Sequence, residues 1–160
     1  MPLIEVERFT KVFGETPAVD DLSFQVEGGQ ILGLVGPNGA GKTTTLRPLA
    51  GIFPPTRGAL RVAGSDVVKQ PLEAKRRLAL ISDEPHLFES LTVWEHLAFT
   101  ARIFRVDDWV ERAEQLLDEL EMTENRPKMA DELSRGMRQK VVVACAFLHD
   151  PDVLLLDEPL

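Results

Sequence analysis

An apolar run that passes directly into a glycine-rich turn constrains the fold of this chain more than any other feature. Residues 30–35 read Gln-Ile-Leu-Gly-Leu-Val, and residues 36–44 read Gly-Pro-Asn-Gly-Ala-Gly-Lys-Thr-Thr. This order predicts a buried strand, a tight loop and a helix beginning near Lys42, which is the arrangement of a phosphate-binding P-loop. The glycines let successive N–H groups converge on one anion, and the helix adds its positive N-terminal end. The pattern therefore predicts a site for a nucleoside triphosphate.

The chemistry of the P-loop gives its residues separate roles. Lys42 supplies a positive charge to the β- and γ-phosphates, and Thr43 supplies a hydroxyl to Mg²⁺. Gly36, Gly39 and Gly41 are expected to surround the phosphates together with these two residues.

Composition excludes several other classes of protein. The net charge is −8, with 26 acidic against 18 basic residues, so no nucleic-acid-binding surface is expected. The one cysteine, Cys145, excludes an internal disulfide, and its apolar neighbours predict a buried structural thiol. The longest apolar run, residues 141–148, is too short to span a bilayer. We expect a soluble, cytosolic protein.

Periodicity predicts two kinds of strand. Alternating residues predict strands at 3–9 and 22–26, and continuous apolar runs predict strands buried on both faces. These buried strands are expected at residues 31–35, 78–81 and 153–156, with a further strand at 59–63. Pro48 lies inside the expected P-loop helix and predicts a kink or a short helix there.

A block of helices separates the last two buried strands. Pro71 opens a short helix before it, and residues 92–95 form a capping box that begins a helix within it. Asp107 or Asp108 is expected to cap a second helix, and Ser134 precedes a third. The sequence thus predicts one α/β domain with a core at 1–85, a helical lobe at 86–150 and a returning strand at 151–160.

An acidic pair, Asp157 and Glu158, follows the last predicted strand. Such a pair is usually only a solvated strand end. Downstream of a P-loop, however, the aspartate typically helps to hold Mg²⁺ and the glutamate polarises the attacking water. The pair therefore predicts a metal ligand, Asp157, and a catalytic residue, Glu158.

One further segment completes a family pattern. Residues 133–137 read Leu-Ser-Arg-Gly-Met and precede the acidic strand. With this signature segment, the P-loop and the acidic pair in the same order, the chain resembles the ATP-binding subunit of an ABC transporter over essentially its whole length. The resemblance implies a P-loop NTPase core with a mostly parallel sheet, N-terminal antiparallel strands and an inserted helical lobe.

The resemblance also implies a function. It predicts an ATPase that uses ATP and Mg²⁺ and works with a transmembrane permease subunit and a second ABC ATPase subunit on the cytoplasmic face of the membrane. Residues 81–95 resemble those of bacterial exporter-type subunits. Two alternatives remain open: a truncated ATP-binding fragment without turnover, and a soluble ABC ATPase not linked to transport. The acidic balance and the single P-loop argue against the second.

The resemblance implies that Asn38 and Thr44 join Gly36, Gly39, Gly41, Lys42 and Thr43 around the phosphates.

Four residues outside the P-loop also take roles from the resemblance. Phe13, within residues 11–14, would stack on adenine, although a core phenylalanine is the alternative reading. Ser134 and Gly136 would contact the γ-phosphate of ATP held by the second subunit, and Ser134 would also cap its helix. Asp83 stands where the family's Q-loop usually has glutamine. We expect it to be a further Mg²⁺ ligand, and the alternative is a role in transmission to the membrane partner.

The chain departs from the family at its end. Family members continue with a D-loop, a strand that inserts between the P-loop strand and the acidic strand, and a switch histidine. The sequence therefore predicts a gap in the parallel sheet and a core that lacks its C-terminal part. None of His86, His96 and His149 fits the switch position, and surface or capping roles are expected for all of them.

Overall fold

A computed structural model describes residues 1–37 and 39–158, which form two compact units. Unit 1 comprises residues 1–80 and 152–157, and unit 2 comprises residues 81–151 together with Glu158. Asn38, a predicted phosphate ligand, lies outside the described residues. Within the described ranges, no helix is long and apolar enough to cross a membrane.

Unit 1 contains the predicted antiparallel N-terminal strands. They form a sheet in the order β2-β1-β3-β4. Its strands are β1 (Ile4–Phe13), β2 (Thr16–Val26), β3 (Arg57–Val62) and β4 (Ser65–Asp66). Phe9, Leu60 and Val62 lie in its core.

Strands β1 and β2 extend beyond the predicted ranges 3–9 and 22–26. The prediction fell short because the two strands are irregular. The register shifts between Val6 and Phe9, and Arg8 has a left-handed φ of 48°. A side chain takes over a hydrogen bond there, since the Arg8 N–H donates to Ser23 Oγ at 2.8 Å. Such bulges and the charged Asp20 and Asp21 interrupt the alternation from which a strand is predicted.

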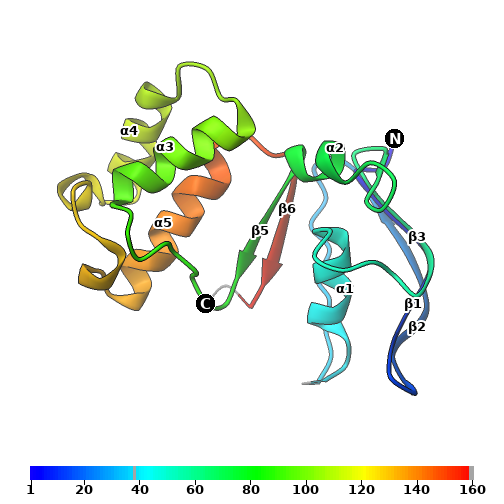
Figure 1. The fold of residues 1–160 in the computed structure, drawn as a ribbon. Helices are drawn as coiled ribbons and strands as arrows, with labels where there is room; N and C mark the ends of the chain where they lie inside the picture. The colour runs from blue at the N-terminus through cyan, green and yellow to red at the C-terminus, as the bar shows by residue number, and fades with distance from the viewer. Residues whose placement is uncertain (38, 159–160) are drawn as a thin grey trace. The chain divides into compact units, whose positions relative to one another are not determined.

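A second sheet pairs β5 (Leu78–Ser82) with β6 (Val153–Asp157), and Figure 1 shows the two strands running in the same direction. In β6, Val153 and Leu155 are buried, whereas Leu154 and Leu156 are exposed. The prediction that this strand is buried on both faces is therefore wrong. Two helices complete unit 1, α1 (Lys42–Leu49) and α2 (Pro71–Arg76). Helix α1 is short, as Pro48 predicts.

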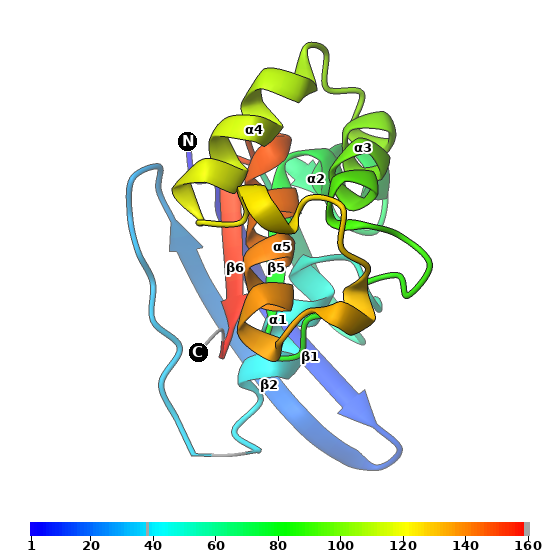
Figure 2. The same ribbon diagram turned by 90° about the vertical axis from the view of Figure 1, so that its left-hand side faces the viewer.

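Residues 31–35 do not form the predicted buried strand. The segment has no regular structure, and the side chains of Ile31 and Val35 are fully exposed. Figure 2 shows an irregular trace between β2 and α1. A strand needs a neighbour to pair its backbone groups, and no strand among the described residues pairs with this segment. Local apolar character alone was not sufficient to make it a strand.

Unit 2 is helical and has its own core. Its helices are α3 (Val93–Phe104), α4 (Trp109–Glu119) and α5 (Arg135–Leu148), with short 3₁₀ turns at Thr123–Asn125 and Ala130–Glu132. Leu97, Leu117 and Val141, one from each helix, are completely buried in one cluster. The apolar faces of α3 and α4 thus pack against α5.

The starts of α3 and α4 differ in their capping. The predicted capping box is confirmed: Thr92 Oγ1 accepts the Glu95 N–H at 3.2 Å, and Glu95 Oε2 accepts the Thr92 N–H at 2.8 Å. The N–H and the hydroxyl of Thr92 both donate to the Glu95 carboxylate and hold the pKa of Glu95 below its usual value. Asp108 occupies the N-cap position of α4, but its backbone is left-handed (φ 52°) and its side chain makes no capping hydrogen bond. Asp108 thus has the predicted position but not the predicted capping hydrogen bond.

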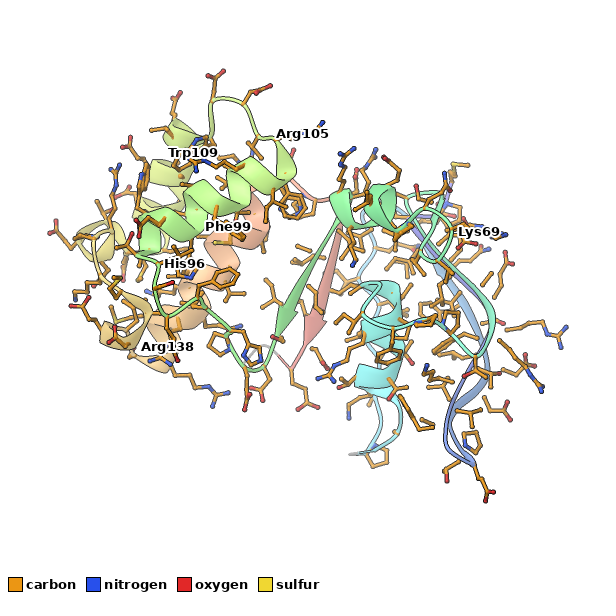
Figure 3. All side chains as sticks on the ribbon, viewed as in Figure 1. Lys69, His96, Phe99, Arg105, Trp109 and Arg138 are labelled. Atoms are coloured by element: carbon orange, nitrogen blue, oxygen red, sulfur yellow. The ribbon has the colours of Figure 1, made fainter. Side chains whose placement is uncertain are left out.

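His96 is buried, contrary to the surface or capping role expected for it (Figure 3). Its Nε2 accepts the Phe88 N–H at 2.9 Å, and its Nδ1 lies 2.7 Å from the carbonyl oxygen of Thr92. One ring nitrogen accepts and the other must donate, so the imidazole is neutral with its proton on Nδ1. These two hydrogen bonds connect residues 88–92 to α3.

Cys145 has the structural role that the sequence predicts. Burial raises the pKa of its thiol to about 11, although a hydrogen bond with Thr100 acts in the opposite direction. The thiol is therefore protonated near neutral pH and is a poor nucleophile.

Candidate functional site

The P-loop turns into α1 at a position where only glycine fits. Gly41 precedes the helix with a φ of 87°. A Cβ atom at Gly41 would lie 2.7 Å from the carbonyl oxygen of Ala18. Gly39 also has a left-handed φ, of 83°. The loop thus depends on backbone conformations that other residues adopt only with strain.

Lys42 reaches back across the loop from the first position of α1. Its Nζ donates to the carbonyl oxygens of Gly36 at 2.7 Å and Pro37 at 3.2 Å. The ammonium group therefore lies beside the loop backbone and the helix N-terminus, which both attract anions.

Thr43 and Asp157 meet although they are 114 residues apart in sequence. Thr43 Oγ1, in the first turn of α1, donates to Asp157 Oδ1, at the end of β6, at 2.8 Å. Both residues belong to unit 1, and both are only partly buried. The contact brings two oxygen ligands together at the start of the P-loop helix.

This pair of oxygens fits a magnesium ion bound together with phosphate. Mg²⁺ prefers oxygen ligands and usually takes only one or two protein groups besides water and substrate phosphates. The described residues hold no cluster of three or more His, Cys, Asp or Glu that could bind a metal without such help. Thr43 and Asp157 are therefore suited to a metal that arrives with a nucleotide.

Phe13 lies at the end of β1 with 53% of its side chain exposed, so it is not a core phenylalanine. Its ring packs edge-on against Phe53, with centroids 5.8 Å apart. Lys11 Nζ lies 5.2 Å from the Phe13 centroid and 4.7 Å from that of Phe53. An exposed aromatic pair beside a cation can hold a flat, electron-rich ring next to an anion.

The sequence analysis did not single out Phe53 and Lys11, the two residues that pack around Phe13. Lys11 and Phe13 are two residues apart in a strand and so share one face, a signal that could have suggested Lys11. Nothing local in the sequence indicates that Phe53 packs on Phe13, because that contact depends on the path of the chain after α1.

The predicted residues of the signature segment lie in unit 2, at the start of α5. Ser134 is the N-cap and its Oγ accepts the Met137 N–H at 3.3 Å. A Cβ atom at Gly136 would meet no atom within 4 Å, so this position faces open space. The first turn of α5 can therefore be approached closely by a ligand.

Asp83 and Glu158, the other two predicted acidic site residues, are not part of the Thr43–Asp157 contact. The Asp83 carboxylate accepts a hydrogen bond from Arg135 at 2.6 Å within unit 2. Glu158 follows β6 directly, is exposed, and has a left-handed φ of 49°. Of the predicted metal ligands, the structure thus joins Thr43 with Asp157 and gives Asp83 a cationic partner.

Comparison with known proteins identifies the same pattern. A profile of the ABC transporter family matches residues 19–160. The chain is 38% identical over 161 residues to the SkfA peptide export ATP-binding protein SkfE of Bacillus subtilis, covering 99% of this chain and 66% of that protein. It is 40% identical over 159 residues to the spermidine/putrescine import ATP-binding protein PotA of Protochlamydia amoebophila, covering 98% of this chain and 42% of that protein.

A solved structure described as the ATP-binding subunit of an ABC transporter superposes with a TM-score of 0.93 at 33% identity. The superposition covers 98% of this chain and 66% of that structure. The chain therefore spans about two thirds or less of the length of these three proteins.

Proposed function

Because the chain belongs to the ABC transporter family, we propose that it binds Mg·ATP at its P-loop and hydrolyses ATP to drive transport through a separate membrane subunit. The observation that supports this most strongly is the 2.8 Å bond between Thr43 and Asp157. This bond joins a P-loop hydroxyl to the carboxylate at the end of β6.

Binding would use the groups of unit 1. Lys42 would release the carbonyl oxygens of Gly36 and Pro37 and pair with the β- and γ-phosphates, while the N–H groups of the loop and α1 surround them. Phe13 would stack on adenine, and we add Phe53 and Lys11 as its supports. Mg²⁺, held by Thr43 and Asp157 when bound, would neutralise charge on the phosphates.

Hydrolysis would depend on Glu158 and on a second subunit. Glu158 would accept a proton from the attacking water as the water oxygen bonds to the γ-phosphorus and the bond to the ADP oxygen breaks. Ser134 and Gly136 would present the start of α5 to the γ-phosphate of ATP held by the second ABC subunit.

For the transport role we propose an exporter-type subunit that sits on the cytoplasmic face of the membrane. Residues 81–95 resemble those of exporter-type proteins, and one relative is named for peptide export. A relative named for import is equally similar, so the direction of transport rests on that local resemblance. The net charge of −8 supports a role without nucleic acid.

Calorimetric titration with Mg·ATP tests the proposal, using the full natural polypeptide that contains this chain. Lys42→Ala should weaken binding at least tenfold, because the loss of a charge-assisted phosphate contact costs about 1.5–3 kcal/mol. Lys69→Ala is the matched control, since Lys69 is an exposed lysine of the same unit that pairs only loosely with Asp66, at 3.9 Å (Figure 3). Equal affinities for the wild type and Lys42→Ala would refute the P-loop assignment.

Phosphate release measured on the same preparations tests turnover. The alternative function, an ATP-binding fragment, predicts Mg·ATP binding that depends on Lys42 with no steady-state release of phosphate.

A further inference from the structure

Arg135, the third residue of the signature segment, makes a contact with the residue that follows β5. It is the first residue of α5, and one of its guanidinium nitrogens, Nη2, donates to Asp83 Oδ1 at 2.6 Å. The same nitrogen lies 3.4 Å from the carbonyl oxygen of Asp83. Arg135 thus binds both the side chain and the backbone of the residue that directly follows β5.

A second residue of α5 binds the neighbouring position. Gln139 Nε2 donates to the carbonyl oxygen of Ser82 at 3.3 Å. Arg135 and Gln139 are four residues apart and share one face of the helix. That face therefore presents two donors, one turn apart, to two consecutive residues.

The amide of Gln139 is also poorly satisfied. Its Oε1 is buried and has no hydrogen-bond partner among the described residues. The bond to Ser82 is then the only one found for this amide within residues 1–37 and 39–158. We call Ser82, Asp83, Arg135 and Gln139 the α5 clamp; all four lie in unit 2. Figure 1 shows the first turn of α5 beside the segment that follows β5.

We propose that Arg135 is a positioning residue, which through Asp83 holds the start of the signature helix in a fixed place relative to the loop after β5. Ser134, the N-cap, and Gly136 flank Arg135 directly, so the clamp fixes the turn that we propose to face ATP of the second subunit. This inference rests on that proposed function. It also gives Asp83 a role other than metal ligand, because its carboxylate already has a cationic partner.

The charges give the pair a second effect. An unpaired carboxylate at residue 83 would repel anionic phosphates, and an unpaired guanidinium at residue 135 would attract them indiscriminately. Bound to each other they form a neutral pair, so neither charge competes with the neutral groups of the helix N-terminus. Substituting one member alone leaves the other charge uncompensated.

The effect is expected to be modest because the pair is exposed. The side chains are 71% exposed at Arg135 and 53% at Asp83. Such a pair changes an equilibrium constant by up to about fivefold. We therefore expect a change in turnover of about two- to fivefold, without loss of folding.

A double-mutant cycle in the full natural polypeptide tests the clamp through kcat for ATP hydrolysis. Arg135→Gln and Asp83→Asn should each lower kcat by about two- to fivefold, and the double variant should be no slower than either single variant. Arg135→Lys should restore part of the activity, because it keeps the charge but not the fork of donors. At 1 M salt, where the screening length is about 3 Å, the advantage of the wild type should shrink.

Lys140 and Glu121 provide a matched control on the same helix. They form an exposed ion pair at 4.0 Å. Lys140→Gln, Glu121→Gln and their double variant should leave kcat unchanged, since this pair does not touch the end of β5.

Two outcomes would overturn the inference. One is a double variant whose kcat falls by the product of the two single effects, which would mean that Arg135 and Asp83 act independently. The other is an increase of more than fivefold in the Mg²⁺ concentration for half-maximal activity in Asp83→Asn but not in Arg135→Gln. That result would make Asp83 a metal ligand.

Hydrogen exchange separates failure of the clamp from failure of the proposed function. If the wild type releases no phosphate, the proposed ATPase activity fails, but the clamp still predicts faster amide exchange at residues 83–88 in Arg135→Gln than in Lys140→Gln. Equal exchange in the two variants would refute the clamp whatever the activity.

Discussion

Replacing Thr43 with valine tests the contact on which the site depends. Valine keeps the shape of threonine but removes the hydroxyl that donates to Asp157 Oδ1 at 2.8 Å. A hydrogen bond to a charged group contributes about 1.5–3 kcal/mol. Both residues are only partly buried, so we expect Thr43→Val to lower the free energy of unfolding by about 1 kcal/mol.

Urea unfolding followed by far-ultraviolet circular dichroism measures this change. Tryptophan fluorescence is less suitable, because Trp94 and Trp109 both lie in unit 2 whereas Thr43 and Asp157 lie in unit 1. With a slope of about 2 kcal/mol per molar urea, the midpoint should fall by about 0.5 M. Thr43→Ser, which keeps the hydroxyl, should unfold near the wild-type midpoint.

The same variants report on magnesium. Thr43→Val should raise the Mg²⁺ concentration needed for tight ATP binding, and Thr43→Ser should not, because only the hydroxyl can be a ligand. The reasoning fails if Thr43→Val matches both the wild type and Thr43→Ser in urea midpoint and in Mg²⁺ dependence.

Three further predictions concern other parts of the chain. Phe13→Ala should weaken ATP binding by about 1–3 kcal/mol in calorimetry, and Phe13→Trp should retain it; a lower melting temperature with unchanged affinity would contradict the stacking role. Cys145 has a thiol pKa raised from 9.0 to about 11, so the unfolded chain loses its proton first as the pH rises. The stability that this thiol contributes is therefore present below pH 9 and lost between pH 9 and about 11. In Cys145→Ala the urea midpoint should vary less with pH over this range than in the wild type. Leu117 is 1% exposed, and changing it to alanine should lower the free energy of unfolding by about 2–5 kcal/mol. Val110 on the same helix is 45% exposed and should cost far less, so equal urea midpoints for Leu117→Ala and Val110→Ala would refute the assigned core.

Elements set by local chemistry were predictable from sequence. The capping box at Thr92, the N-cap at Ser134 and the short α1 helix each depend on a few adjacent residues, and the structure contains all of them. The hydrogen bonds of the two caps close within one helical turn, so neither cap needs a partner that is distant in the sequence.

Features that need a distant partner were predicted less well. Residues 31–35 have the composition of a buried strand, but strand formation requires a neighbouring strand that the described residues do not supply. In β6, Leu154 and Leu156 are exposed although they belong to a continuous apolar run. Apolar composition therefore identified segments suited to a sheet without determining their pairing.

Side-chain partners far apart in sequence gave no local signal. Asp83 and Arg135 are 52 positions apart, and each alone is an ordinary surface charge. His96 was expected in a surface or capping role at the start of the helical lobe, yet its bonds to Phe88 and Thr92 satisfy both ring nitrogens and permit burial.

Steady-state phosphate release by Glu158→Gln, measured beside Mg·ATP binding, tests the central proposal most directly. In the full natural polypeptide, this variant should bind Mg·ATP as the wild type does and release phosphate at least about a hundredfold more slowly, because it lacks the general base. Glu119→Gln, at an exposed glutamate that ends α4, should behave as the wild type. Wild-type turnover in Glu158→Gln, or a wild type that binds no Mg·ATP, would contradict the proposed ATPase.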